Sequence, residues 1–334
     1  MRRLAALGAV LALLAAAPAA SARSWAQSEI RAAVGSGLMG PSVAAFRPSA
    51  TLTRADLARI VTGITHRERP ITDPERPVTM TGLNRALVAA LGLAPAAKAI
   101  RSELARADLK PPRRAGWETV ARLLQLRFNH PAANDDRELL PTDPATRAEA
   151  AYSVARVLEL SSWEVERARE AARSFAIPPL TAWQARVLRR AVHFVGFPYI
   201  WGGTSESRET LFGVTSRGGF DCSGFVWRVY KLQRWSGAPR LNAVLRGRTT
   251  FEMAGEMPRA ARIARARLRP ADVVFFGSRG AASAPAEVTH TGISVGGGWF
   301  VHSSSQGTTL APLDGWYATT FAWGRRPLAE VGLR

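Results

Sequence analysis

Apolar residues recur at helical spacing through the first half of the chain. Two such stretches, over residues 25–34 and 117–124, each begin with a tryptophan. The same spacing predicts a charged helix over residues 158–175 and a further helix from Thr181 to Gly196. Pro178-Pro179 lie between these two helices, and proline cannot continue a helix. We therefore expect residues 161–180 to form a helix followed by a linker.

Nearer the C-terminus the pattern changes to that of β-strands. Residues 289–295 and 299–303 read as two strands joined by Gly296-Gly297-Gly298. Since these glycines join two strands and do not enter a helix, they are not expected to bind phosphate.

The length of the glycine loop decides where two histidines lie. If all three glycines form the loop, His302 lies opposite Gly292, and His290 and His302 share one face of the hairpin. A two-residue loop would place the histidines on opposite faces.

Two segments of the first half repeat each other. Phe46-Arg47-Pro48 with Thr53-Arg54-Ala55-Asp56 is matched by Leu139-Leu140-Pro141 with Thr146-Arg147-Ala148-Glu149. Residues 74–87 trace a degenerate middle copy without the Thr-Arg-x-acid signature. Because helical repeats bury their apolar faces against one another, three copies predict one helical domain, bounded at residues 23–160.

Residues 1–22 have the features of an export signal. Arg2 and Arg3 precede an apolar run over residues 4–17, and Ala20-Ser21-Ala22 follows as a cleavage site. The run is too short for a stable membrane span. We expect cleavage after Ala22 and a secreted protein; an uncleaved anchor is the alternative.

The chain of 334 residues is strongly basic, with 45 Lys+Arg against 26 Asp+Glu and a formal charge of +19. Such a protein is attracted to polyanions. No nucleic acid is expected as a partner, because no motif of the common nucleic-acid-binding folds is present. Anionic polymers of the cell wall are the other candidate, and arginines spread over solvated helix faces are the simpler explanation.

Cys222 is the only cysteine of the chain and lies in Phe220-Asp221-Cys222-Ser223-Gly224. Asp221 stands at the N-cap position of a predicted helix, so the dipole of that helix should stabilise a Cys222 thiolate. A sole cysteine with two histidines downstream supplies the thiol and the imidazole base that nucleophilic catalysis requires. No metal or other cofactor is expected, since no metal-binding motif is present.

Five blocks that occur in order resemble the NlpC/P60 cysteine peptidases. They are Pro198-Tyr199-Ile200-Trp201-Gly202-Gly203, then residues 221–224, 269–276, 290–296 and 299–302. The resemblance covers residues 181–329. It implies a papain-like α+β fold and hydrolysis of peptidoglycan stem peptides, at bonds of the γ-D-glutamyl–diaminopimelate type. Residues 204–219 are longer than the family's usual connection and should lie beside the site.

The roles of the site residues follow from triad logic and from this resemblance. Cys222 is the expected nucleophile, His290 the base, and His302 the residue that orients His290. The resemblance places Tyr199 at the oxyanion side. Asp221 and Ser223 are expected to contact the substrate, Asp221 through a free amine of the stem peptide.

The repeats of the first half resemble surface-layer homology (SLH) modules, which bind anionic secondary cell-wall polymers. Arg54 and Arg147 fall at the motif arginine and would face outward to bind the polymer. The same Thr-x-x-acid spacing is also that of a helix capping box, and the two explanations are compatible. The resemblance implies location at the cell wall or cell envelope.

Two alternatives to a wall peptidase stay open. The chain could be a catalytically silent cell-wall-binding protein that keeps the peptidase fold. It could also be a thiol amidase or acyltransferase on the same fold, because all of these enzymes share acyl-enzyme chemistry.

Overall fold

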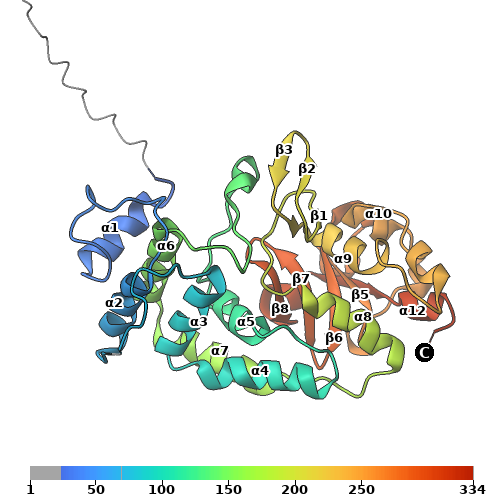
Figure 1. The fold of residues 1–334 in the computed structure, drawn as a ribbon. Coiled ribbons are helices and arrows are strands. Elements are labelled where there is room, and N and C mark those ends of the chain that lie inside the picture. The colour runs from blue at the N-terminus through green and yellow to red at the C-terminus, as the bar shows by residue number, and fades with distance from the viewer. Residues whose placement is uncertain (1–23, 69, 334) are drawn as a thin grey trace, which may run out of the picture.

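The structure is a computed structural model that describes residues 24–68 and 70–333. The expected export signal at residues 1–22 lies outside the described residues. A helical N-terminal unit is followed by a unit of helices and an antiparallel sheet (Figure 1), so the chain has the expected α+β fold. Within the described ranges, no helix is both long and apolar enough to cross a membrane.

The N-terminal unit is built from short helices and one 3-10 helix. They are α1 (Gln27–Gly35), α2 (Arg54–Thr65), α3 (Met80–Ala90), α4 (Ala94–Arg106), α5 (Ala115–Leu123), η1 (Ala132–Arg137), α6 (Arg147–Glu159) and α7 (Ser162–Ser174). The helix predicted over residues 158–175 is therefore wrong at its start, because the chain breaks between α6 and α7.

A closed ring of backbone hydrogen bonds joins the three repeats. The N–H of Leu52 donates to the carbonyl of Ala145 (2.8 Å), Ala145 donates to Val78 (2.8 Å), and Val78 donates to Leu52 (2.9 Å). Each of these residues directly precedes the threonine that caps α2, α3 or α6. The middle copy thus occupies the same structural position as the other two, although its sequence is degenerate.

The caps of these helices differ between copies. Thr53 and Asp56 form the full reciprocal capping box that the spacing predicts. Thr146 accepts from the Glu149 N–H, but the Glu149 carboxylate does not reach back. It lies 3.0 Å from Nε2 of His130, so the second predicted capping box is only half formed.

The C-terminal unit contains one large sheet with helices on its flanks. Its elements are α8 (Ala182–His193), β1 (Thr204–Ser205), β2 (Glu209–Leu211), β3 (Val214–Ser216), β4 (Gly219–Phe220), α9 (Cys222–Tyr230), α10 (Thr250–Gly255), β5 (Val273–Gly277), β6 (Val288–Gly296), β7 (Trp299–Ser304), β8 (Gly307–Pro312), α11 (Gly315–Thr320), β9 (Phe321–Arg325) and α12 (Pro327–Glu330), with short 3-10 turns between them. The sheet order is β8-β7-β6-β5-β9, and every neighbouring pair is antiparallel.

The hairpin of β6 and β7 differs from the prediction at its loop but not at its histidines. Trp299 pairs with Gly296, not with Val295, so only two glycines form the loop. A bulge between Ser294 and Gly296 adds the residue that the shorter loop removes. His302 therefore still lies opposite Gly292, as predicted.

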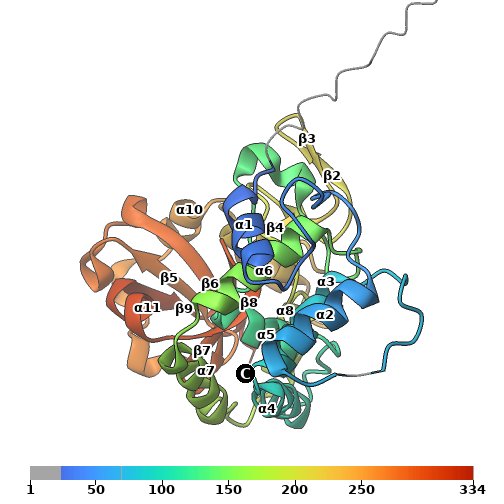
Figure 2. The same ribbon diagram turned by 90° about the vertical axis from the view of Figure 1, so that its left-hand side faces the viewer.

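The two units share one continuous apolar core. Buried side chains of the helical unit and of the sheet unit belong to a single cluster, and α5 packs on β8. Arg122 on α5 donates to the carbonyl of Gly196 (2.8 Å), and Arg114 donates to the carbonyl of Val195 (2.7 Å). Figure 2 shows α7 next to α4 at the lower edge of the molecule, so most of residues 161–180 is a packed helix.

Candidate active site

Cys222 is the first residue of α9. The Asp221 side chain caps this helix by accepting a hydrogen bond from the Gly224 N–H. A Cβ at position 224 would overlap the carbonyl oxygen of Gly203, so glycine is required for the close approach of α9 to residues 198–203. Local capping and close packing together fix the position of the thiol.

The Cys222 sulfur lies at the edge of β6, against the backbone of Thr289, which precedes His290. It is 3.4 Å from the Thr250 hydroxyl and 3.9 Å from the Thr289 carbonyl oxygen. The ladder between β6 and β7 begins only at Gly292, which leaves this part of the β6 edge to the sulfur. Cys222 and the ring of His290, both among the described residues, are not hydrogen-bonded to each other.

The two histidines are joined by a short hydrogen bond. Nε2 of His290 lies 2.8 Å from Nδ1 of His302. The predicted placement of both rings on one face of the hairpin is confirmed. Because His302 occupies Nε2, the Nδ1 atom is the ring nitrogen of His290 that is left to take a proton from a thiol. Tyr317 of α11 packs on both rings, with centroid distances of 6.1 Å and 5.2 Å.

Burial controls the protonation of the site. It lowers the pKa of His290 to about 4 and lowers the pKa of His302 well below its usual value, with the neighbouring His290 as a second cause. Burial and the Asp221 carboxylate raise the pKa of the Cys222 thiol, although the Thr250 hydroxyl and nearby backbone N–H groups oppose them. The net shift of the Cys222 pKa is therefore upward and not downward as predicted, because burial and the Asp221 carboxylate outweigh the stabilising hydroxyl and N–H groups.

Arg248 holds the polar side chains on the other side of Cys222. It donates to Asp221 (3.1 Å and 3.3 Å), to the Ser223 hydroxyl (2.7 Å) and to the Gly202 carbonyl (2.7 Å). Both oxygens of Asp221 thus already accept hydrogen bonds from the chain. That Asp221 and Ser223 contact the substrate stays a prediction.

Tyr199 lies in the same electrostatic environment as the thiol. Its pKa is raised, chiefly by burial and then by the charges of Cys222, Asp221 and Asp135. The N-terminal unit fixes the backbone around it. The Tyr199 N–H donates to Oδ1 of Asn129 (2.9 Å), and the Trp201 N–H donates to Oδ2 of Asp135 (3.0 Å).

The insertion at residues 204–219 forms a hairpin of β2 and β3 beside this segment. Phe212 at its tip is 83% exposed. Arg217 pairs with Asp143 of the N-terminal unit (2.9 Å), and Glu206 pairs with Arg228 of α9 (2.6 Å). The insertion therefore connects the helix that carries Cys222 to the repeats.

The two candidate polymer-binding arginines lie in different surroundings. Arg54 is partly exposed and donates to the Thr72 carbonyl (3.1 Å). Arg147 is buried, donates to the Phe46 carbonyl (2.8 Å) and pairs with Asp56 of the first repeat (2.7 Å). The prediction that Arg147 faces outward is wrong, because the facing repeat supplies it with a carboxylate and an aromatic ring.

Sequence reasoning missed four residues that support the site: Asn129, Asp135, Arg248 and Thr250. The last two adjoin a capping box formed by Thr249 and Glu252, whose Thr-x-x-Glu spacing is visible in the sequence. That spacing places a helix start after Arg248. Nothing in the sequence places this helix start at Cys222.

A cysteine that starts a helix, packed against an antiparallel sheet that carries two histidines, is the arrangement of papain-like thiol hydrolases. Residues 196–326 match the model of the NlpC/P60 family, and residues 20–58 match the model of the S-layer homology domain. The C-terminal unit thus carries the features of the NlpC/P60 family over residues 196–326, and the start of the chain matches an S-layer homology domain over residues 20–58.

Curated relatives align with the C-terminal unit. The murein DD-endopeptidase MepH of Escherichia coli is 34% identical over 123 residues, which is 37% of this chain and 37% of that protein. The gamma-D-glutamyl-L-lysine dipeptidyl-peptidase of Bacillus subtilis is 28% identical over 37% of this chain and 33% of its own length. The probable peptidoglycan endopeptidase LytE of the same species is 32% identical over 40% of this chain and 31% of its own length. The chain spans about a third of the length of these relatives.

Proposed function

We propose that this protein is a secreted cysteine endopeptidase that hydrolyses peptidoglycan stem peptides at a bond of the γ-D-glutamyl–diaminopimelate type. The observation that carries the proposal is the hydrogen bond between His290 and His302, where His290 follows Thr289, whose carbonyl oxygen lies 3.9 Å from the sulfur of Cys222. The relatives named as peptidoglycan and γ-D-glutamyl peptidases support the same substrate class.

The reaction follows from the free ring nitrogen of His290. Nδ1 takes the proton of Cys222 as the sulfur attacks the carbonyl carbon of the scissile amide. The backbone N–H of Cys222 and the Tyr199 hydroxyl stabilise the oxyanion. When the C–N bond breaks, His290 returns the proton to the leaving amine and a thioester remains. Water then attacks the thioester, His290 takes its proton, and the acid is released as the sulfur regains a proton.

His302 keeps the base in position during both steps. Its Nδ1 and the Nε2 of His290 share one proton between two neutral rings, and that hydrogen bond fixes the orientation of the His290 ring. The low pKa of His290 keeps its ring unprotonated, and therefore able to accept the thiol proton, at neutral pH.

A digest of purified peptidoglycan tests this proposal. The wild-type protein should release stem-peptide fragments whose masses identify the bond, and the Cys222→Ala variant should release none. A thiol-to-methyl change at the helix start costs little packing, so the variant should stay folded. Equal release of fragments by both proteins would refute the assignment of Cys222. If neither protein releases fragments, the silent wall-binding alternative is favoured.

We also propose that the N-terminal repeats hold the protein on an anionic secondary cell-wall polymer. A cavity of about 290 Å³ lies between α2 and α3, with Arg54 among its lining residues. Arg54 is partly exposed there and its ion pair with the exposed Asp73 is long (3.6 Å), whereas Arg147 forms a short, mostly buried pair with Asp56 (2.7 Å).

Sedimentation with intact walls tests the anchoring role in the full-length chain. Arg54→Ala should weaken pelleting, and wild-type pelleting should weaken as salt screens the charges. Arg59→Ala is the matched control, because Arg59 lies on the same helix but does not line the cavity. Equal pelleting of the two variants would contradict the role of Arg54.

A further inference from the structure

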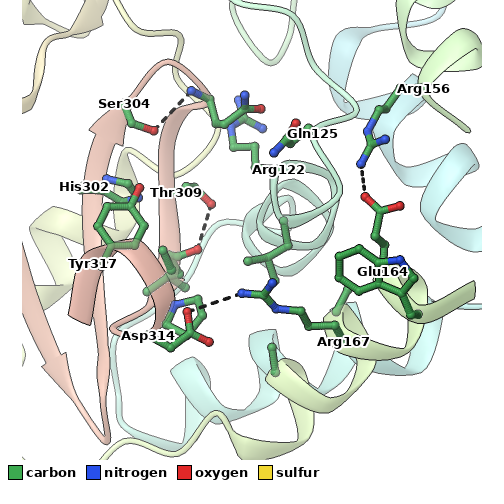
Figure 3. A pocket seen from close by; sticks show the side chains of 18 residues that line it. Arg122, Gln125, Arg156, Glu164, Arg167, His302, Ser304, Thr309, Asp314 and Tyr317 are labelled. Carbon is green, nitrogen blue, oxygen red and sulfur yellow. Dashed lines mark hydrogen bonds and ion pairs between the residues drawn. The ribbon is translucent and has the colours of Figure 1, made fainter. Parts of the chain in front are cut away.

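A groove runs between the two units on the side of the histidine pair. It has a volume of about 340 Å³ and is lined by α5 and α7 on one side and by β7, β8 and the start of α11 on the other. Figure 3 shows His302 and Tyr317 on the sheet side, facing Arg167 and Glu164 of α7. The helical unit thus builds one wall of a space whose other wall carries a member of the catalytic pair.

The chemistry of the groove favours an uncharged, hydroxylated ligand. Its charged groups are already balanced, because Arg156 pairs with Glu164 (2.5 Å) and Arg167 approaches Asp314 across the groove (3.8 Å). A polyanion would find no free excess of positive charge there. Paired charged groups keep donor and acceptor capacity for neutral hydroxyl and amide groups.

Two further features point to a sugar. Trp163 of α7 lines the groove with 61% of its surface exposed, and an exposed indole offers an apolar face with a polar N–H at its edge. Gln306 also lines the groove, and its buried Oε1 has no hydrogen-bond partner. An apolar ring face with a few unsatisfied polar groups suits the C–H face and the N-acetyl groups of an amino sugar.

Two side chains of the groove belong to the histidine pair or pack against it. Tyr317 lines it and packs on both histidine rings, and His302 is part of its lining. In peptidoglycan the stem peptide is attached covalently to a sugar of the glycan strand. A ligand that fills the groove and the site together would therefore carry both a sugar and a peptide.

We propose that this groove, defined by Trp163, Arg167, Gln306 and Tyr317, binds the N-acetylated disaccharide of the glycan strand while the attached stem peptide reaches Cys222. The inference rests on the proposed function, since it assumes a peptidoglycan substrate. It makes the helical unit part of the substrate-binding surface in addition to its role in wall attachment.

The test compares two soluble substrates, a disaccharide-peptide and the same peptide without the sugars. Trp163→Ala should lower the ratio of kcat/KM for the sugar-bearing substrate to that for the free peptide by about tenfold. Arg167→Ala should lower the same ratio, whereas Arg173→Ala should not. Arg173 is the matched control, because it lies on the same helix with similar exposure and does not line the groove.

Each outcome separates this inference from the proposed function. An unchanged ratio in Trp163→Ala, or an equal fall for both substrates, would overturn the glycan site and leave the peptidase standing. If the wild type cleaves neither substrate, the proposed function fails. Calorimetric titration of the disaccharide-peptide into Cys222→Ala, with and without Trp163→Ala, then measures binding to the groove independently of hydrolysis. Equal affinity of the two proteins would overturn the inference.

Discussion

His290 and His302 share one hydrogen bond, and His290 directly follows Thr289, whose carbonyl oxygen lies 3.9 Å from the Cys222 sulfur. His290→Ala should therefore reduce hydrolysis nearly as far as Cys222→Ala, by several orders of magnitude. His302→Asn should keep measurable activity, because an amide can still hydrogen-bond to Nε2 of His290. His302→Ala should lose more, since nothing then holds the ring. The measurement is kcat/KM on a soluble muropeptide.

The unfolding free energy of each histidine variant is the control, because the His302 ring is buried and the His290 ring is half-buried. If His302→Asn were as inactive as His290→Ala while equally stable, the two roles would have to be exchanged.

We expect His290 to set the acid limit of activity. Burial lowers its pKa from 6.5 to about 4, so the imidazole remains able to accept a proton well below neutral pH. The acid limb of kcat/KM should lie near pH 4, and activity should stay level through neutrality because the raised pKa of Cys222 keeps the thiol protonated there. A pH profile on a soluble substrate measures this. An acid limb near 6.5 would show that burial does not control the base.

At the level of residues, the sequence predicted the three candidate catalytic side chains but not the residues that support them. Cys222 stands out as the sole cysteine, and the spacing of His290 and His302 fits one face of a hairpin. Arg248 and Thr250 could not be placed, because the chain between Tyr230 and the start of α10 lacks a periodic pattern. Their contacts with the site depend on packing between elements that local sequence does not encode.

At the level of elements, the 3-10 helix η1 holds the backbone next to Tyr199 in place. Asp135 is 5% exposed and accepts the Trp201 N–H from 66 residues away in the chain. Asp135→Ala would leave that N–H without its partner and let residues 198–203 shift. We expect kcat/KM to fall by about ten- to a hundredfold, since small displacements of catalytic groups are costly.

Two variants separate positioning from general destabilisation. Asp135→Asn should retain most activity, because the amide oxygen can accept the same hydrogen bond. Asp136→Ala should behave as the wild type, because the Asp136 side chain, which follows Asp135 in the chain, is exposed. If Asp135→Asn lost as much activity as Asp135→Ala at equal stability, the negative charge and not the hydrogen bond would be responsible.

The hairpin of β6 and β7 shows why the histidines were placed correctly although the loop length was not. The sequence predicted a three-glycine loop, and the chain uses a two-residue loop with a bulge before it. Both keep the alternation of faces, so the histidines stay together. The outward placement of Arg147 failed for the opposite reason. Its surroundings are set by Asp56 and Phe46 of another repeat, which the spacing within one repeat does not reveal.

At the level of the whole molecule, the two units behave as one body in the structure. Arg122 is fully buried on α5, forms an ion pair with Glu118, and donates to the Gly196 carbonyl of the sheet unit. Glu118 in turn accepts from Thr81 (2.9 Å) and Asn84 (3.0 Å) of the repeats. This network and the shared apolar core couple the repeats to the segment that leads into Tyr199.

Arg122→Ala should therefore destabilise the whole chain and not one unit. Removing one partner of a buried ion pair leaves the other charge buried and unpaired, which costs about 3–5 kcal/mol. Urea unfolding, followed by circular dichroism and by loss of hydrolysis, should give one coincident transition at a lower midpoint. Arg169→Ala is the control, because its pair with Glu166 is exposed and should contribute less than about 1 kcal/mol. Two separate transitions would show that the repeats and the sheet unit unfold independently. An equal effect of both variants would show that the buried ion pair contributes little to stability.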